Sequence, residues 1–317
     1  MTRLGFTAPI FGFDVRATCD LAREAEGIGY TDCWSAETSG PDGFSVASAI
    51  GVVTTSLRIG CAIAPVYTRP PALIAMSALA ADQASGGRFC LGLGASSPVI
   101  VEGWMGQALE RPVTRMRESV EIIKAAWAGE KVDFSGATVR SKGFRLDPPP
   151  VKPIPLYLAA LGPQMMKLAG EVADGVALFL ASEEGVRIAS KECPGLDLVE
   201  RIMCCPDEDP EQVRDAARWM LTPYVAVPAY NRFIAAQGFE DEAKAVADAW
   251  AARERDKARE AISDRLVDAL VVMGSTAECK ERLDSFREAG LGTPILAPFS
   301  LTGDPERVAT ALRSLAP

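Results

Sequence analysis

The residues best placed to do chemistry lie in two short loops that each follow an apolar strand and precede a helix. The first loop contains Gly94-Ala95-Ser96 and the second contains Gly162-Pro163-Gln164. Small residues let a flat ring or a phosphate approach the backbone closely, and N–H groups at the start of a helix bind anions. We interpret both loops as a cradle for a large cofactor. The alternative is that Gly92 and Gly94 simply let their strand turn.

A second set of candidates is acidic and aromatic. Glu37 is the only carboxylate that comes directly after a predicted strand, and Trp34 precedes it in that strand. We expect Glu37 to position a cofactor or to handle a proton, the alternative being a solvated loop acid. Trp104, followed by Met105, lies in a loop after another strand. It is either a wall of the substrate pocket or an aromatic side chain packed over the rim.

The chain of 317 residues contains no histidine. This excludes Ser-His-Asp and Cys-His nucleophile systems and the usual zinc sites, so no metal site is expected. Acid–base chemistry must come from carboxylates, Lys, Tyr, Cys or a cofactor. The eight cysteines include no CxxC pair and are interpreted as buried, inert thiols in a reducing cytoplasm.

Strands and helices must alternate to position these loops. We expect one domain over residues 1–317 that forms a (β/α)8 barrel, because such barrels carry their functional residues in the loops after the strands. The alternative, a doubly wound sheet, would need fewer strands and a glycine fingerprint near the N-terminus. Two insertions are predicted, a surface hairpin at about 130–152 and several helices at about 210–265. The expected strands cover 4–8, 30–35, 58–63, 89–93, 155–159, 175–180, 198–204 and 294–297.

Charge and hydropathy limit the classes of molecule that this protein is expected to bind. The net charge is −9 and no basic cluster is present, which argues against nucleic acid and anionic membrane surfaces. No apolar run approaches 18 residues and no signal peptide is recognisable, so no membrane segment is expected. A small-molecule substrate remains.

Several segments resemble the luciferase-like monooxygenase superfamily, and within it the oxidoreductases that use the deazaflavin coenzyme F420. They occur in the same order over nearly the whole chain. The segments are GYTDCWSAE, LRIGCAIAPVYTRPPALIA, DQASGGRFCLGLGASSP, VEGWMG, PIPLYLAALGPQMMKLAGEVADG and VVMGSTAECKERL.

The resemblance implies a (β/α)8 barrel, usually a homodimer. It also implies a cis peptide bond at Ala62–Ile63 behind the deazaflavin ring, with both small-residue loops touching the cofactor's tail and phosphate. Glu37 matches the family's acid, whereas Thr38 and Met105 stand where relatives have histidine. A mechanism that needs an imidazole therefore does not carry over to this chain.

Three functions remain open from the sequence. The first is an F420-dependent oxidoreductase that transfers a hydride to or from a small organic substrate, with Glu37 and Trp104 at the reacting centre and Trp34, Thr38 and Met105 around the substrate. In this hypothesis the protein orients the reactants and excludes water. The second is an FMN-dependent monooxygenase that uses O₂. The third is a flavin-binding or ligand-binding barrel without turnover.

Overall fold

Eight parallel strands close into a ring. The computed structural model describes residues 2–317. Each strand pairs with its neighbour, and β9 pairs with both β8 and β11, which closes the sheet. The predicted (β/α)8 barrel is therefore confirmed. In ring order the strands are β1 (Gly5–Ala8), β2 (Asp32–Ser35), β3 (Arg58–Pro65), β4 (Phe89–Gly94), β7 (Leu156–Ala159), β8 (Gly175–Phe179), β9 (Asp197–Pro206) and β11 (Thr293–Pro298).

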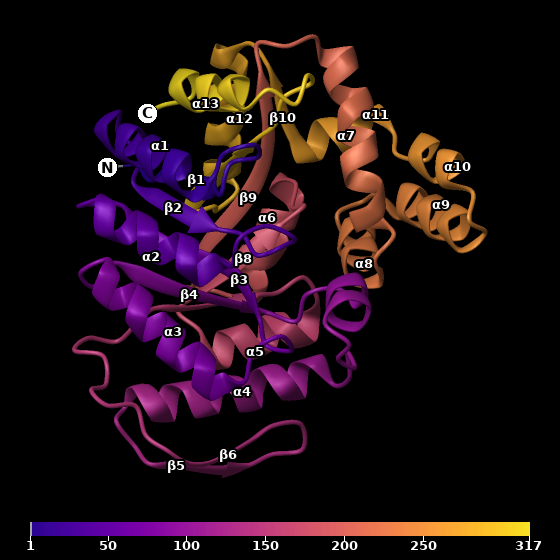
Figure 1. Ribbon diagram of the computed structural model, residues 1–317. Coiled ribbons are helices and arrows are strands. Elements are labelled where there is room, and N and C mark those ends of the chain that lie inside the picture. The colour runs from indigo at the N-terminus through magenta and orange to yellow at the C-terminus, as the bar shows by residue number, and fades with distance from the viewer. Residues whose placement is uncertain (1) are drawn as a thin grey trace.

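Helices surround this ring (Figure 1). Several begin at a side-chain cap that satisfies a free N–H group of the first turn, as at Asp14, Ser275 and Asp304. Ser275 and Glu278 form a reciprocal capping box. The surrounding helices are α1 (Val15–Gly27), α2 (Gly43–Val53), α3 (Pro71–Ala84), α4 (Pro112–Trp127), α5 (Pro163–Val172), α6 (Glu183–Glu192), α12 (Thr276–Glu288) and α13 (Pro305–Ser314).

The floor of the barrel is a charged network at the amino ends of the strands. Arg58 donates to Asp197 Oδ2 at 2.9 Å and to the Tyr157 hydroxyl at 2.7 Å, and it also pairs with the buried Asp32. Arg3 pairs with the other oxygen of Asp197. Residues at this end of a (β/α)8 barrel serve stability, so we read the network as structural.

Trp34 fills the middle of the barrel above this floor. Its side chain is 2% exposed, and its ring packs edge-on against Tyr157 with 5.1 Å between centroids. A Cβ atom at Gly60 would overlap the Trp34 ring, so the facing position on β3 must be glycine. The close packing leaves the carboxyl ends of the strands as the open end of the barrel.

The predicted helical insertion follows β9, and Figure 1 shows its helices gathered on one side of the barrel. It ends in a short strand, β10 (Val271–Gly274), which the sequence reading missed. Residues 203–206 of β9 pair with β10, on the edge that β8 occupies lower down. Four residues are too few to show the alternation of apolar and polar side chains that identifies a strand. The insertion helices are α7 (Pro210–Val225), α8 (Pro228–Ala236), α9 (Glu240–Ala251), α10 (Arg255–Glu260) and α11 (Asp264–Leu270).

Three further details concern the other connections. The stretch predicted as a hairpin contains the antiparallel pair β5 (Val132–Ser135) and β6 (Arg140–Phe144). The loop expected around Trp104 is instead a π-helical turn, η1 (Val99–Trp104). Pro65, expected outside regular structure, is the last residue of β3, where its missing N–H interrupts no further pairing.

Candidate active site

The β3 strand bulges where it reaches the mouth of the barrel. Its register with β4 shifts between Cys61 and Ala64, and the peptide bond Ala62–Ile63 within this bulge is cis, as the resemblance implies. Ala62 and Ile63 are half-buried and pack against the interior cluster that contains Trp34. Both predicted residues therefore form part of the inner wall of the mouth.

Gly94 ends β4 directly beside this bulge. A Cβ atom there would lie 2.6 Å from Ile63 Cδ1, and the Gly94 carbonyl already accepts a hydrogen bond from Val66 N at 3.0 Å. Packing against β3 thus gives a structural reason for this glycine. Ala95 and Ser96 follow and are half-buried. Ser96 has φ 66°, a left-handed conformation of a kind found at ligand sites and costing about 1–3 kcal/mol.

The second predicted loop opens α5. Gly162 is the N-cap residue, no side chain caps this helix, and Pro163 occupies its first turn. No atom lies within 4 Å of the position that a Gly162 Cβ would take, and Gln164 is exposed. Pro163 has no N–H, and Met165 N already donates to the Gly162 carbonyl at 3.0 Å. The start of α5 therefore offers the Gln164 N–H and the positive end of the helix dipole to open space, an arrangement suited to an anion such as a phosphate.

Glu37 follows β2 and is held by a residue that the sequence reading missed. Arg69 Nη1 lies 2.7 Å from Glu37 Oε2 and Arg69 Nη2 lies 2.5 Å from Glu37 Oε1. Hydrogen bonding to Glu37 and the charges of Glu37 and Asp42 overcome burial and raise the pKa of Arg69. Thr38, the next residue, is exposed. The signal for Arg69 was weak, because it lies in a proline-rich loop 32 positions further along the chain.

The three remaining predicted residues lie at different depths. Trp34 is buried beneath the mouth, whereas the side chains of Trp104 and Met105 are 52% and 46% exposed. Both side chains at the end of η1 therefore face solvent. Within residues 2–317, no aromatic contact joins Trp104 to Trp34.

A group of polar and aromatic side chains at the mouth was not predicted from the sequence. Side chains two residues apart on a strand share a face. Arg201 and Phe179 therefore point inward like Val199 and Ala177, which belong to the interior cluster. The guanidinium carbon of Arg201 lies 4.9 Å from the centre of the Phe179 ring. The available signal was a lone basic residue inside a predicted apolar strand.

Two tyrosines of the insertion complete this group. Tyr224 on α7 and Tyr230 on α8 pack edge-on against Phe179, with ring centroids 5.1 and 6.0 Å away. Their own rings are 5.8 Å apart. Because α7 and α8 come after β9, these contacts place part of the insertion at the mouth of the barrel.

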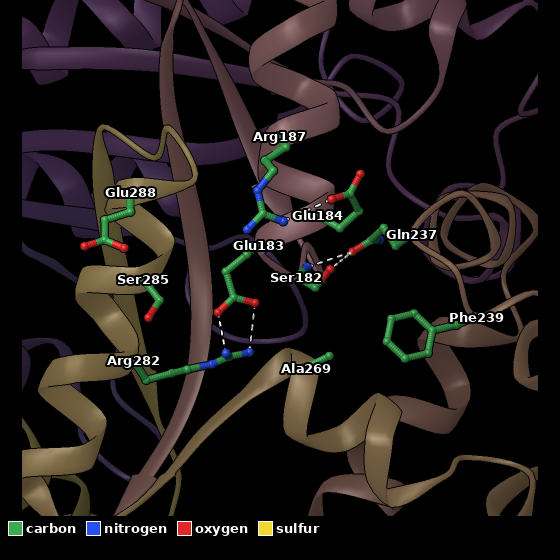
Figure 2. A pocket seen from close by; sticks show the side chains of 10 residues that line it. All are labelled: Ser182, Glu183, Glu184, Arg187, Gln237, Phe239, Ala269, Arg282, Ser285 and Glu288. Carbon is green, nitrogen blue, oxygen red and sulfur yellow. Dashed lines mark hydrogen bonds and ion pairs between the residues drawn. The ribbon is translucent and has the colours of Figure 1, made fainter.

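A separate hollow of about 660 Å³ lies between α6, α11 and α12 (Figure 2). Its charges are largely paired with one another, as Arg282 with Glu183 and Arg187 with Glu184. It contains none of the mouth residues, and we do not regard it as the site of chemistry. Its lining residues are Ser182, Glu183, Glu184, Arg187, Gln237, Phe239, Ala269, Arg282, Ser285 and Glu288.

The cysteines and acids offer no further site of this kind. All eight cysteines are buried and free, and burial raises the pKa of the Cys61 thiol to about 12. Across residues 2–317, no three His, Cys, Asp or Glu side chains are grouped so that they could hold a metal ion. None of the helices over the same residues combines the length and the apolar character needed to cross a membrane.

Comparison with known proteins finds relatives that match most of the chain. The 5,10-methylenetetrahydromethanopterin reductase of Methanolobus tindarius is 26% identical over 86% of this chain and 89% of its own length. The F420-dependent glucose-6-phosphate dehydrogenase of Mycolicibacterium smegmatis is 30% identical over 68% of this chain and 73% of its own.

The solved structure of the coenzyme F420 dependent tetrahydromethanopterin reductase from Methanopyrus kandleri superposes with a TM-score of 0.80. The match covers 99% of this chain and 98% of that chain at 19% identity, and at this identity it supports the fold. The sequence model of the luciferase-like monooxygenase family matches residues 2–293. This protein therefore belongs to the luciferase-like monooxygenase family.

Proposed function

We propose that this protein is an oxidoreductase that depends on coenzyme F420 and transfers a hydride between the deazaflavin and a small organic substrate. The relative named an F420-dependent glucose-6-phosphate dehydrogenase supports this cofactor. The observation that carries the proposal is the pairing of two features at one end of the barrel. The wall at Ala62 offers a surface for a ring, and the uncapped start of α5 offers the Gln164 N–H and the positive end of the helix dipole for a phosphate.

The residues present fit such a cofactor. Thr7 is 8% exposed and its Oγ1 has no hydrogen-bond partner within the described chain, although Thr7 points into the barrel near the mouth. A hydroxyl buried without a partner is costly, so a polar ring edge at this height would satisfy it. Gly94 and Ala159, on the other strands of the wall, carry no bulk that would block a ring.

We assign the predicted residues roles that suit these positions. Ala62 and Ile63 back the ring, and the segments Gly94–Ser96 and Gly162–Gln164 hold the tail and its phosphate. Glu37, fixed by Arg69, positions the ring or handles a proton. Trp34 supports the wall from below, and Trp104, Thr38 and Met105 border the substrate. When bound, the deazaflavin supplies the hydride chemistry, while the chain orients the reactants and excludes water.

A titration of the purified protein with oxidised F420 and separately with FMN tests this proposal. We expect saturable F420 binding and much weaker FMN binding. FMN binding alone would replace the proposal by a monooxygenase that uses O₂. Binding of both without turnover over a broad substrate panel would favour a barrel that only binds flavins, and binding of neither would overturn the site.

Two variants at one position make the test specific for the phosphate. Gly162→Asn and Gly162→Asp both provide a helix cap, but only the second adds a negative charge at the start of α5. We expect Gly162→Asp to bind F420 about tenfold more weakly than Gly162→Asn, equivalent to about 1.4 kcal/mol. Equal affinities would remove the start of α5 from the cofactor site.

We further propose a cytoplasmic homodimer. The eight free cysteines suit a reducing compartment. Val52 on α2 and Leu73 and Met76 on α3 are exposed apolar side chains on neighbouring helices, a kind of surface that a second subunit covers. Light scattering on Leu73→Glu tests the dimer, and an unchanged mass of two subunits would exclude this face from the interface.

A further inference from the structure

The mouth of the barrel contains a cation without a counter-charge. Arg201 is half-buried and its Nε is shut off from solvent without a hydrogen-bond partner. None of its guanidinium nitrogens takes part in an ion pair or hydrogen bond in the portion of the chain that the structure describes. Its guanidinium lies over the face of Phe179, and burial lowers the pKa of Arg201.

The neighbouring acid does not neutralise this charge. Glu200 is 1% exposed, and burial raises its pKa well above the usual range, which disfavours its charged form. One of its oxygens accepts a hydrogen bond from Ala181 N at 3.0 Å. Glu200 also points out of the barrel, because it alternates with the inward-facing Val199 and Arg201. A partly buried cation without a counter-charge is costly, so an anionic ligand that pairs with Arg201 would be favoured at this site.

Two tyrosines pack against the same Phe179 ring that the guanidinium faces, Tyr224 with 5.1 Å and Tyr230 with 6.0 Å between ring centroids. The positive charge of Arg201 works against the burial that raises the pKa of Tyr230. Neither tyrosine hydroxyl is hydrogen-bonded to any side chain or backbone group in residues 2–317. A guanidinium can only donate hydrogen bonds, and each tyrosine hydroxyl can donate one as well, so the group can direct several donors at one acceptor. Carboxylates and phosphates are the groups that accept from such a set.

The position of this group in the ring assigns it to the substrate. With the ring order given above, β9 is four strands away from β3, so Arg201 faces the Ala62–Ile63 wall across the mouth. The proposed cofactor ring lies against that wall, and its phosphate lies at the start of α5. Arg201 is therefore free for a second molecule, held between the ring and the insertion.

We propose that Arg201, Tyr224 and Tyr230 bind the anionic group, a carboxylate or a phosphate, of the substrate. This inference rests on the proposed function, because it uses the position of the deazaflavin to assign the site. The rings of Phe179, Tyr224 and Tyr230 line the approach, so the part of the substrate next to its anion is apolar or aromatic. The anion anchors one end of the substrate and thereby directs its other end toward the ring.

Benzoate and phenyl phosphate are suitable probes, with benzyl alcohol as the neutral control. We expect one or both anions to bind the protein saturated with F420 in a calorimetric titration, and benzyl alcohol not to bind. We expect Arg201→Met to weaken anion binding at least about 30-fold, a loss typical of a charged hydrogen-bonding partner. Whichever probe binds more tightly identifies the anion as carboxylate or phosphate.

Matched variants separate binding from folding. Arg23→Met removes an exposed arginine on α1 that pairs only with Asp20 in its own helix, and should bind the probes like the parent protein. Tyr224→Phe and Tyr230→Phe keep the packed rings and remove the hydroxyls, and each should weaken anion binding about 3- to 10-fold. Arg201→Met itself should unfold at the same or a higher urea concentration, because it removes an unpaired buried charge.

The outcomes distinguish this inference from the proposed function. If Arg201→Met binds F420 within about threefold of the parent and loses the anions, the inference holds. If Arg201→Met loses F420 instead, Arg201 belongs to the cofactor site and the inference is wrong while F420 dependence stands. If the parent binds F420 but neither anion, the inference is likewise overturned. If the parent does not bind F420, the same titrations without cofactor decide it by whether Arg201→Met abolishes anion binding.

Discussion

Arg69 pairs with both carboxylate oxygens of Glu37 just beyond the carboxyl end of β2. Its Nη1 lies 2.7 Å from Oε2, and its Nη2 lies 2.5 Å from Oε1. The two side chains are only 16% and 15% exposed, so water competes weakly with the pair. Glu37 is thus not a mobile loop acid but a carboxylate held in one orientation. Arg69 is in turn fixed over the Phe44 ring, 5.4 Å from its centre.

This pair predicts different results for its two partners. Arg69→Met leaves Glu37 as an unpaired, partly buried carboxylate and should lower the free energy of unfolding by about 1–3 kcal/mol. Glu37→Gln leaves a neutral amide and should cost less. Urea unfolding measures both. If Glu37 contacts the cofactor, Glu37→Gln also weakens F420 binding, and unchanged affinity and turnover would remove Glu37 from the site.

Trp34 and Gly60 give a prediction about packing. In Gly60→Ala the added methyl group overlaps the Trp34 ring in a closed barrel that cannot expand, so we expect a loss of about 3 kcal/mol or more. Gly170→Ala on α5 is the matched control. No atom lies within 4 Å of its added methyl group, and alanine in a helix should stabilise the protein by about 0.5–1 kcal/mol. Thermal unfolding that shows equal effects for both variants would contradict this packing.

Glu26 gives a prediction about pH. Burial alone would raise its pKa, but hydrogen bonds from Ser56, Thr55 and Leu57 lower it to about 2 from a usual 4.5. The carboxylate therefore stabilises the fold fully above about pH 4.5, and this contribution is lost as the pH falls from about 4.5 toward 2. Urea unfolding of the parent and of Glu26→Gln at a series of pH values checks it. Their difference should shrink below about pH 4.5, and a constant difference would show that Glu26 does not act through its charge.

Gln237 gives a prediction about the insertion. Its Oε1 accepts from Ser182 N at 2.7 Å and from Ser182 Oγ at 2.9 Å, and its Nε2 donates to the carbonyls of Leu180 and Phe233. This side chain fastens the end of α8 to the loop after β8, as Figure 2 shows for its contact with Ser182.

Gln237→Leu leaves buried polar groups without partners and should cost about 2–3 kcal/mol. Gln212→Leu changes an exposed glutamine of α7 and should be nearly neutral. Hydrogen exchange over residues 210–270 should accelerate in Gln237→Leu alone. If exchange there stays as slow as in the parent, the insertion is anchored by its apolar packing rather than by Gln237.

Much of the barrel could be predicted because its signals are local. Apolar strands such as Arg58–Pro65 and Phe89–Gly94 are bounded by glycine and proline, and the helix between them has an apolar face. Strand β10 escaped prediction because it consists of four residues directly after α11, with neither a period nor a turn to mark it. The π-helical turn at Val99–Trp104 escaped for a related reason, since six residues cannot show a helical repeat.

The sequence by itself determined that this chain alternates strands and helices, contains no histidine and carries small-residue loops after its strands. These properties depend on residue types and on spacings within about 20 positions. Only the tertiary structure decided that Arg69 holds Glu37 and that Arg201, Tyr224 and Tyr230 meet at one mouth. Arg69 lies 32 positions after Glu37, and Tyr224 and Tyr230 belong to different helices from each other and to different elements from Arg201. Closure of the ring sets which strand ends face one another, and the packing of the insertion decides which of its side chains reach the barrel.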